Sequence, residues 1–224
     1  MRRGSDMSEP VFYRVRHATE PPSGLLDAAH PAWAVSDEIA WGPPRFETLF
    51  RALWTPETLA IRFAVRDDAP WHTMRKRDDH LWEEEVVEIF LDPSRSGHGY
   101  AELEISPANV VCDVRMQSPW PDKHMDLAWD FVGLSTVVAP WRERDGLVGW
   151  MATATMPWSD FASLPARAQL PPAPGDRWRF NVFRIKRPGG PGDPEAGVLY
   201  LAWSPNPSPS FHYPDAFRDF VFDR

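Results

Sequence analysis

The chain is very poor in cysteine, and this shortage excludes two kinds of site. Cys112 is the single cysteine among 224 residues, so an intrachain disulfide framework and a multi-cysteine zinc cluster are both excluded. Cys112 lies in the strand-like run VVCDVRM. We therefore expect it to be a small residue of the core rather than a nucleophile.

The chain also lacks long apolar runs and an excess of positive charge. No stretch reaches the about 18 apolar residues of a membrane-spanning helix, so we expect none. The net charge of −8 argues against nucleic acid and against an anionic membrane surface as partners. No apolar run follows the N-terminal arginines, which indicates no signal peptide and a cytoplasmic location. A secreted or periplasmic location is expected if the chain is a processed or truncated form.

Proline and tryptophan, in contrast, are abundant, with 25 and 12 residues. Helix interiors exclude proline and sheet centres rarely accept it, so many prolines predict strands joined by long loops. The expected fold is all-β: an antiparallel β-sandwich, jelly-roll-like or immunoglobulin-like, with long proline-rich loops and at most one or two short helices. We expect a disordered tail over residues 1–10 and a single domain over residues 11–224.

Alternating apolar and polar residues predict about nine to eleven strands. The predicted strands or strand pairs cover residues 11–18, 46–54, 59–68, 82–93, 100–116, 134–139, 148–158, 178–188, 198–206 and 219–224. The TPET turn predicts that the second and third of these form a hairpin, and the last is expected to be an edge strand. One short helix is expected within residues 159–170, with Ser159 as its N-cap.

The segment WEEEVVEIFLDP, residues 82–93, contains a carboxylate inside a run of strand formers. Strand alternation places Glu88 on one face with Val86 and Phe90. A charge on a buried strand is costly unless it is paired, so Glu88 is expected on a concave, partly wet face with Trp82 at its rim. This combination suits a sugar ring. The alternative is a strand that starts in solvent, with Glu88 bonded to a neighbouring Arg or Tyr.

Six segments, in this order along the chain, resemble the carbohydrate-binding modules of family 9, which belong to a wider superfamily of DOMON-like β-sandwiches. They are FRALWTPETLAIRFAVRD, LWEEEVVEIFLDP, GWMATATMPWSDF, PAPGDRWRFNVFRI, AWSPN and FHYPDAFRDFVF, and the resemblance spans about residues 25–222. It implies a β-sandwich that binds carbohydrate without catalysis. The implied ligand is the terminal, reducing-end sugar of a gluco- or xylo-oligosaccharide.

The resemblance also implies which residues bind the sugar. Trp82 and Phe211 match the two aromatic rings that clamp the sugar, and Glu88 matches the acid that binds its hydroxyls. A tryptophan is usual at the position of Phe211, and phenylalanine offers less stacking area and no N–H donor. Other polar positions of the family fall near Glu104 and Ser106 and near Phe183, where this chain departs from the family pattern. Glu104 is a further candidate ligand-binding residue.

Further aromatic residues have several possible roles. His212, between Phe211 and Tyr213, is expected to donate or accept a hydrogen bond near the clamp. Trp71, on a polar loop, is either an additional platform or lid for the ligand or a side chain that packs on its own loop. The remaining tryptophans of the predicted strands are expected in the core: Trp54, Trp150, Trp178 and Trp203.

The resemblance implies structural calcium in loops and a glycosidase as a possible partner. Asp67, Asp68 and Asp92 are candidate oxygen ligands, although no ordered set of ligands like that of an EF-hand is present.

Two other functions remain open. An enzyme could use facing carboxylates from the acidic cluster, which contains Glu83, Glu84, Glu85, Glu88, Glu102 and Glu104, because paired carboxylates catalyse glycoside hydrolysis. Alternatively, residues 83–85 are solvated acids at the strand entrance, and no nucleophile elbow is visible. Some sandwiches of the superfamily bind haem, for which the available ligands are His72 with Met74, or Met116 and His124.

Overall fold

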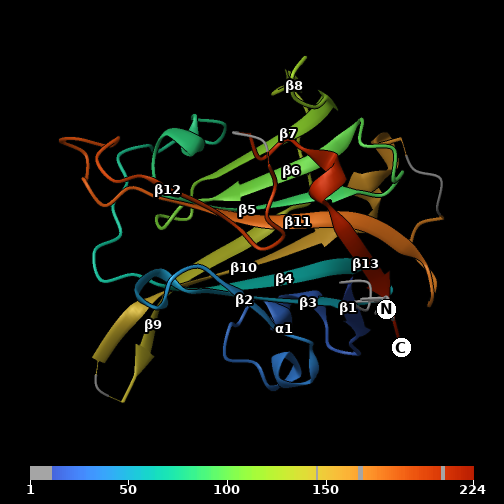
Figure 1. Ribbon diagram of the computed structural model, residues 1–224. Coiled ribbons are helices and arrows are strands. Elements are labelled where there is room, and N and C mark those ends of the chain that lie inside the picture. The colour runs from blue at the N-terminus through green and yellow to red at the C-terminus, as the bar shows by residue number, and fades with distance from the viewer. Residues whose placement is uncertain (1–11, 145, 166–168, 208–209) are drawn as a thin grey trace, which may run out of the picture.

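The chain folds mainly into strands, as Figure 1 shows for the computed structural model. The structure describes residues 12–144, 146–165, 169–207 and 210–224, so the predicted tail over residues 1–10 lies outside it. The strands are β1 (Phe12–His17), β2 (Ile39–Trp41), β3 (Thr48–Trp54), β4 (Thr58–Arg66), β5 (Val86–Asp92), β6 (Tyr100–Ile105), β7 (Val111–Ser118), β8 (His124–Asp126), β9 (Ser135–Glu143), β10 (Gly146–Pro157), β11 (Arg177–Lys186), β12 (Leu199–Ala202) and β13 (Arg218–Phe222).

Proline-rich loops connect the strands, and the helical segments are short. The helical segments in the described part of the chain are the α-helix α1 (Pro22–Leu25) and the 3₁₀ helices η1 (Pro31–Val35), η2 (Pro44–Phe46), η3 (Leu81–Glu83), η4 (Trp158–Ser163) and η5 (Pro214–Ala216). Among the described residues, no helix is long and apolar enough to cross a membrane. The helix predicted within residues 159–170 is η4, which begins at Trp158 after Pro157, so the prediction of Ser159 as an N-cap was wrong.

The strands form two sheets that are continuous through β1, in the order β8-β7-β6-β5-β11-β13-β1-β3-β4-β10-β9. Strand β12 lies beside β11, and β2 lies beside β3. The first half of β1, Phe12–Val15, pairs with β13, whereas Arg16 and His17 pair with β3. Strand β1 therefore joins two sheets, and Figure 1 shows how the chain wraps from one sheet to the other. The predicted β-sandwich is confirmed, but the sheet is mixed because β1 runs parallel to both neighbours.

Strand β13 is not at an edge, contrary to the sequence-based prediction. It pairs with β11 through Arg218–Val221 and with β1 on its other side. Phe220 and Phe222 are fully buried between the two sheets. The predicted hairpin over the TPET turn is confirmed as β3 and β4.

The main core lies between the two sheets and contains side chains from both. Trp54, Trp150 and Trp178 are buried in it, as predicted, and Trp203 packs on Phe180 with a ring-centroid distance of 5.1 Å. A second apolar cluster covers the opposite face of β5, β6 and β7 and contains the buried Cys112. Burial raises the pKa of the Cys112 thiol, in agreement with its predicted role as a core residue.

Candidate functional site

Strand β5 carries Glu88 on the face of the sheet that points away from the main core. Val87, Ile89 and Leu91 enter the main core, whereas Val86 and Phe90 belong to the cluster on the outer face. Period-two alternation places Glu88 with this outer set, so the predicted side for Glu88 is confirmed. On β6, Glu104 lies directly opposite Glu88, and Glu102 lies opposite Phe90, so one face of a strand pair carries three acids.

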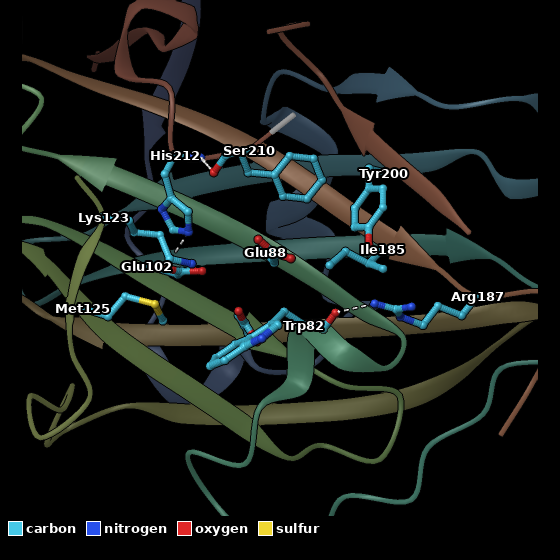
Figure 2. A pocket seen from close by; sticks show the side chains of 12 residues that line it. Trp82, Glu88, Glu102, Lys123, Met125, Ile185, Arg187, Tyr200, Ser210 and His212 are labelled. Carbon is cyan, nitrogen blue, oxygen red and sulfur yellow. Dashed lines mark hydrogen bonds and ion pairs between the residues drawn. The ribbon is translucent and has the colours of Figure 1, made fainter. Parts of the chain in front are cut away.

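A cavity of about 180 Å³ opens above these acids. Figure 2 shows Glu88 at its centre, Trp82 on one side, and His212 and Tyr200 on the other. Strands β5, β6, β11 and β12, helix η3 and the loops before β8 and η5 all contribute side chains. The lining residues are Trp82, Glu88, Glu102, Glu104, Lys123, Met125, Ile185, Arg187, Tyr200, Ser210, Phe211 and His212.

The three acids of the floor are almost completely inaccessible to solvent. Glu88 and Glu102 are 2% exposed and Glu104 is 0% exposed, and one oxygen atom of each lies within 4.8 Å of one from each of the others. Apart from a hydrogen bond between the carboxyl groups of Glu102 and Glu104, both oxygens of Glu104, Oε1 of Glu88 and Oε2 of Glu102 have no hydrogen-bond partner within the described part of the chain. Such groups are costly to bury, so the floor offers several unused acceptor positions to a ligand.

Burial and mutual repulsion change how these acids ionise. Burial raises the pKa of Glu102 to about 7, and burial followed by repulsion from Glu102 raises the pKa of Glu88 well above its usual value. The pKa of Glu104 is raised as well, by burial and then by the charges of Glu88 and Glu102. Lys123, an exposed residue of the lining, opposes all three increases in pKa. At neutral pH the cluster therefore retains protons, so it can both donate and accept hydrogen bonds.

His212 closes one side of the cavity as a neutral ring. Burial and the nearby Lys123 lower the pKa of His212 to about 3. Its Nδ1 lies 3.0 Å from the Tyr100 hydroxyl, its Nε2 lies 3.9 Å from Oε2 of Glu102, and its ring stacks on Phe90. Because the imidazole is uncharged, it does not neutralise the acids of the floor.

The rim of the cavity is aromatic. Trp82 belongs to η3 and stacks on His80 with a centroid distance of 4.5 Å, while Phe211 stacks on the buried Phe183 at 4.3 Å. Tyr200, on β12, contacts Phe211 edge-on and is 55% exposed. Supporting rings therefore fix the orientation of both predicted clamp residues, which is a requirement for stacking on a ligand.

The structure brings together five of the six predicted ligand-binding residues: Trp82, Glu88, Glu104, Phe211 and His212. Trp71 does not line the cavity, because its indole Nε1 donates a hydrogen bond to the backbone oxygen of Arg187, at 2.7 Å. Sequence reasoning missed Lys123, Arg187 and Tyr200 as lining residues. Only Tyr200 had a local signal, since it alternates with apolar neighbours in a predicted strand.

The rest of the predicted acidic cluster does not reach the cavity. Glu83 is exposed beside His80, whereas Glu84 and Glu85 are buried, so the interpretation of residues 83–85 as solvated acids was wrong for two of them. Glu84 accepts hydrogen bonds from Thr73 and from the backbone N–H of Met74. The side chain of Glu85 pairs with Lys186 at 2.6 Å, and burial raises the pKa of Glu85 to about 8.

The proposed calcium ligands do not form a common site. Asp67 is buried between Arg184 and Lys186, at 2.6 and 2.9 Å, so its charge is already balanced. The carboxylate of Asp68 pairs with Arg45 on the surface, and Asp92 accepts hydrogen bonds from Ser94 and from the backbone of Gly97. The three side chains therefore do not fit a shared calcium ion. The candidate haem ligands His72, Met74, Met116 and His124 do not line the cavity.

Comparisons with known proteins identify the family and support the fold. The family model for carbohydrate-binding family 9 matches residues 22–222. A family 9 module from Caldicellulosiruptor kristjanssonii, solved with cellotriose, superposes with a TM-score of 0.65 at 13% identity, covering 95% of this chain and 94% of that one. Its complex with glucose gives a TM-score of 0.63 at 13% identity, covering 96% and 97%.

A protein from Bacteroides uniformis that is thought to bind carbohydrate has a TM-score of 0.72 at 18% identity, with 96% of this chain and 100% of that chain covered. At these identities, the solved structures support the fold alone. Among curated proteins, none matches the sequence.

Proposed function

The chain belongs to carbohydrate-binding family 9, and on this premise we propose that its cavity binds the terminal sugar of a gluco- or xylo-oligosaccharide without catalysing a reaction. One observation carries the proposal: buried acids with unused oxygen atoms lie at the floor of a small cavity that has an aromatic rim. Sugar hydroxyls supply donors for such oxygens, and the apolar face of a pyranose ring stacks on aromatic side chains. The module from Caldicellulosiruptor kristjanssonii was solved with cellotriose and with glucose, ligands of this class.

The size of the cavity supports a terminal sugar rather than the middle of a chain. Its volume of about 180 Å³ is below the ~300–1,000 Å³ that is usual for drug-sized ligands, which is consistent with one or two sugar units. We further propose that this unit is the reducing end. The remainder of the oligosaccharide would then leave past the exposed Tyr200.

In this proposal, Trp82 and Phe211 stack on the two faces of the sugar, and Glu88 and Glu104 bind its hydroxyls. Each stacking ring contributes about 1–2 kcal/mol, by analogy with aromatic pairs. Because such a small cavity offers few further contacts, we expect a dissociation constant of about 10–100 µM.

Titration calorimetry with glucose, cellobiose, xylobiose and the corresponding alditols tests the proposal. We expect heat of binding from the reducing sugars and none from the alditols, whose terminal ring is open. Equal binding of cellobiose and its alditol would contradict the reducing-end proposal, and no binding of any of these sugars would contradict the proposed function.

The same samples also test the glycosidase alternative, which the close approach of three acids keeps open. Chromatography after the titration should show intact cellobiose. Release of glucose by the wild-type chain, lost in Glu88→Gln, would instead support catalysis.

A further inference from the structure

The cavity carries more acid groups than its cations balance. Glu88 and Glu104 face each other directly across β5 and β6, in an arrangement where like charges repel. Of the cations in the lining, Lys123 is exposed. Arg187 is engaged elsewhere, since its guanidinium donates to the backbone oxygens of Trp82 and Pro194 and pairs with Glu195.

The unused oxygens point to the missing partner. Oε1 of Glu88 is buried and, among the described residues, has no hydrogen-bond partner, and the buried oxygens of Glu104 have none outside the bond between the carboxyl groups of Glu102 and Glu104. A buried carboxylate without a counter-charge is strongly unfavourable, so the acids of the free cavity retain protons at neutral pH. A bound cation with matching donors makes the ionised form favourable, and the displaced protons then pass to solvent. The floor is therefore built to accept a positively charged group.

Resting on the proposed function, we propose that the preferred ligand is a cationic sugar, a 2-amino-2-deoxy-hexose unit whose ammonium group binds between Glu88 and Glu104. An ammonium has three donors and no acceptor, which matches the acceptor oxygens that the acids offer once they have lost their protons. Hydrogen bonds in which both groups are charged are roughly twice as strong as those between neutral groups. The aromatic rim adds to the preference, because the faces of tryptophan and phenylalanine attract cations.

The geometry also explains why a neutral sugar is a poorer ligand. Hydroxyl groups can form hydrogen bonds with the acids but bring no positive charge, so Glu88, Glu102 and Glu104, whose oxygens lie within 4.8 Å of one another, stay protonated beside a neutral sugar and form only the weaker, uncharged hydrogen bonds. His212 supplies no positive charge either. Burial lowers the pKa of His212 to about 3, so its ring stays neutral.

Calorimetry with three monosaccharides tests the inference: D-glucose, D-glucosamine and N-acetyl-D-glucosamine, at about pH 6.5, where an amine of ordinary pKa is charged. The buffer contains EDTA, so that any metal is removed. We expect glucosamine to bind at least about tenfold more tightly than glucose, and the neutral N-acetyl sugar to lose this advantage.

Variants identify the source of the preference. Glu104→Gln keeps the shape of the side chain and removes its charge, so the ratio of glucosamine to glucose affinity should fall to about one, and Glu88→Gln should lower the same ratio. Glu143→Gln makes the same chemical change on an exposed residue that pairs with Arg66 away from the cavity, and it should leave the ratio unchanged. Circular dichroism confirms that each variant is folded.

The outcomes separate the inference from the proposed function. If glucose binds as tightly as glucosamine, the inference is overturned while the proposed function stands. If none of the three sugars binds, both are overturned. A parallel titration omits EDTA and contains added calcium. Binding of glucose that appears only in this titration would also overturn the inference, because a metal ion would then be the counter-charge of the acids. A glucosamine preference that Glu104→Gln removes supports the inference.

Discussion

Replacing Glu102 by glutamine should make the chain more stable, and increasingly so as the pH rises. Burial raises the pKa of Glu102 from 4.5 to about 7. A group whose pKa is raised on folding contributes stability that is fully present below its unfolded pKa and lost as pH rises through its folded pKa. A difference of this size corresponds to about 3 kcal/mol, lost between about pH 4.5 and pH 7.

The neighbouring groups set the sign and limit the size of this effect. Burial, and after it the charges of the cluster, raises the pKa values of Glu88 and Glu104, so removing the charge of Glu102 favours their ionised forms and adds to the gain. The hydrogen bond between Glu104 and Glu102 limits the gain, because it lowers the pKa of Glu102. Lys123 works in the opposite direction, because it stabilises ionised Glu102. His212 does not titrate in this window, since its pKa is lowered to about 3.

Urea unfolding at a series of pH values from about 4.5 to 8 measures the effect. The difference in unfolding free energy between Glu102→Gln and wild type should be small at the acidic end and grow to about 3 kcal/mol by neutral pH. Glu143→Gln, an exposed counterpart, should show no such growth. A difference that stays constant across the series would refute the argument that Glu102 is protonated by burial.

Two further predictions concern binding and stability. Trp82→Ala should weaken sugar binding by about tenfold or more because it removes a stacking face, while the thermal midpoint changes little, since the ring is only half-buried. Trp141→Ala, on the β9 surface, is the control, and a Trp82→Ala chain that fails to fold would show that this ring is structural. Asp67→Ala should cost about 3–5 kcal/mol in urea unfolding because it leaves buried cations such as Lys186 without a counter-charge. The exposed Asp68→Ala should cost less than about 1 kcal/mol, and equal costs would contradict this assignment.

Local sequence patterns predicted those parts of the fold that depend on one strand or one hairpin. Alternation in β5 placed Glu88 on the face opposite Val87 and Ile89. Alternation did not reveal that β1 lies between β13 and β3. The pairing of β1 with β13 joins residues from opposite ends of the chain, so no local pattern indicates it. The error over β13 has the same origin, because its second neighbour is β1, at the opposite end of the chain.

The candidate site was predictable to a similar extent. Trp82 and Glu88 belong to a single motif, and Phe211 with His212 to another, so a resemblance could place them. Lys123 approaches the acids from a loop before β8, and no local pattern announces it. Burial of Glu84 and Glu85 was missed because three adjacent acids usually indicate solvent, whereas here the loop over residues 69–80 and the cation of β11 satisfy them.

A crystal structure of the chain grown with cellobiose tests the central claim most directly, that this cavity is a carbohydrate-binding site. We expect density for a terminal glucose between Trp82 and Phe211, with hydroxyl oxygens within hydrogen-bond distance of Glu88 or Glu104. A sugar bound on another surface, with no sugar density in the cavity, would contradict this claim.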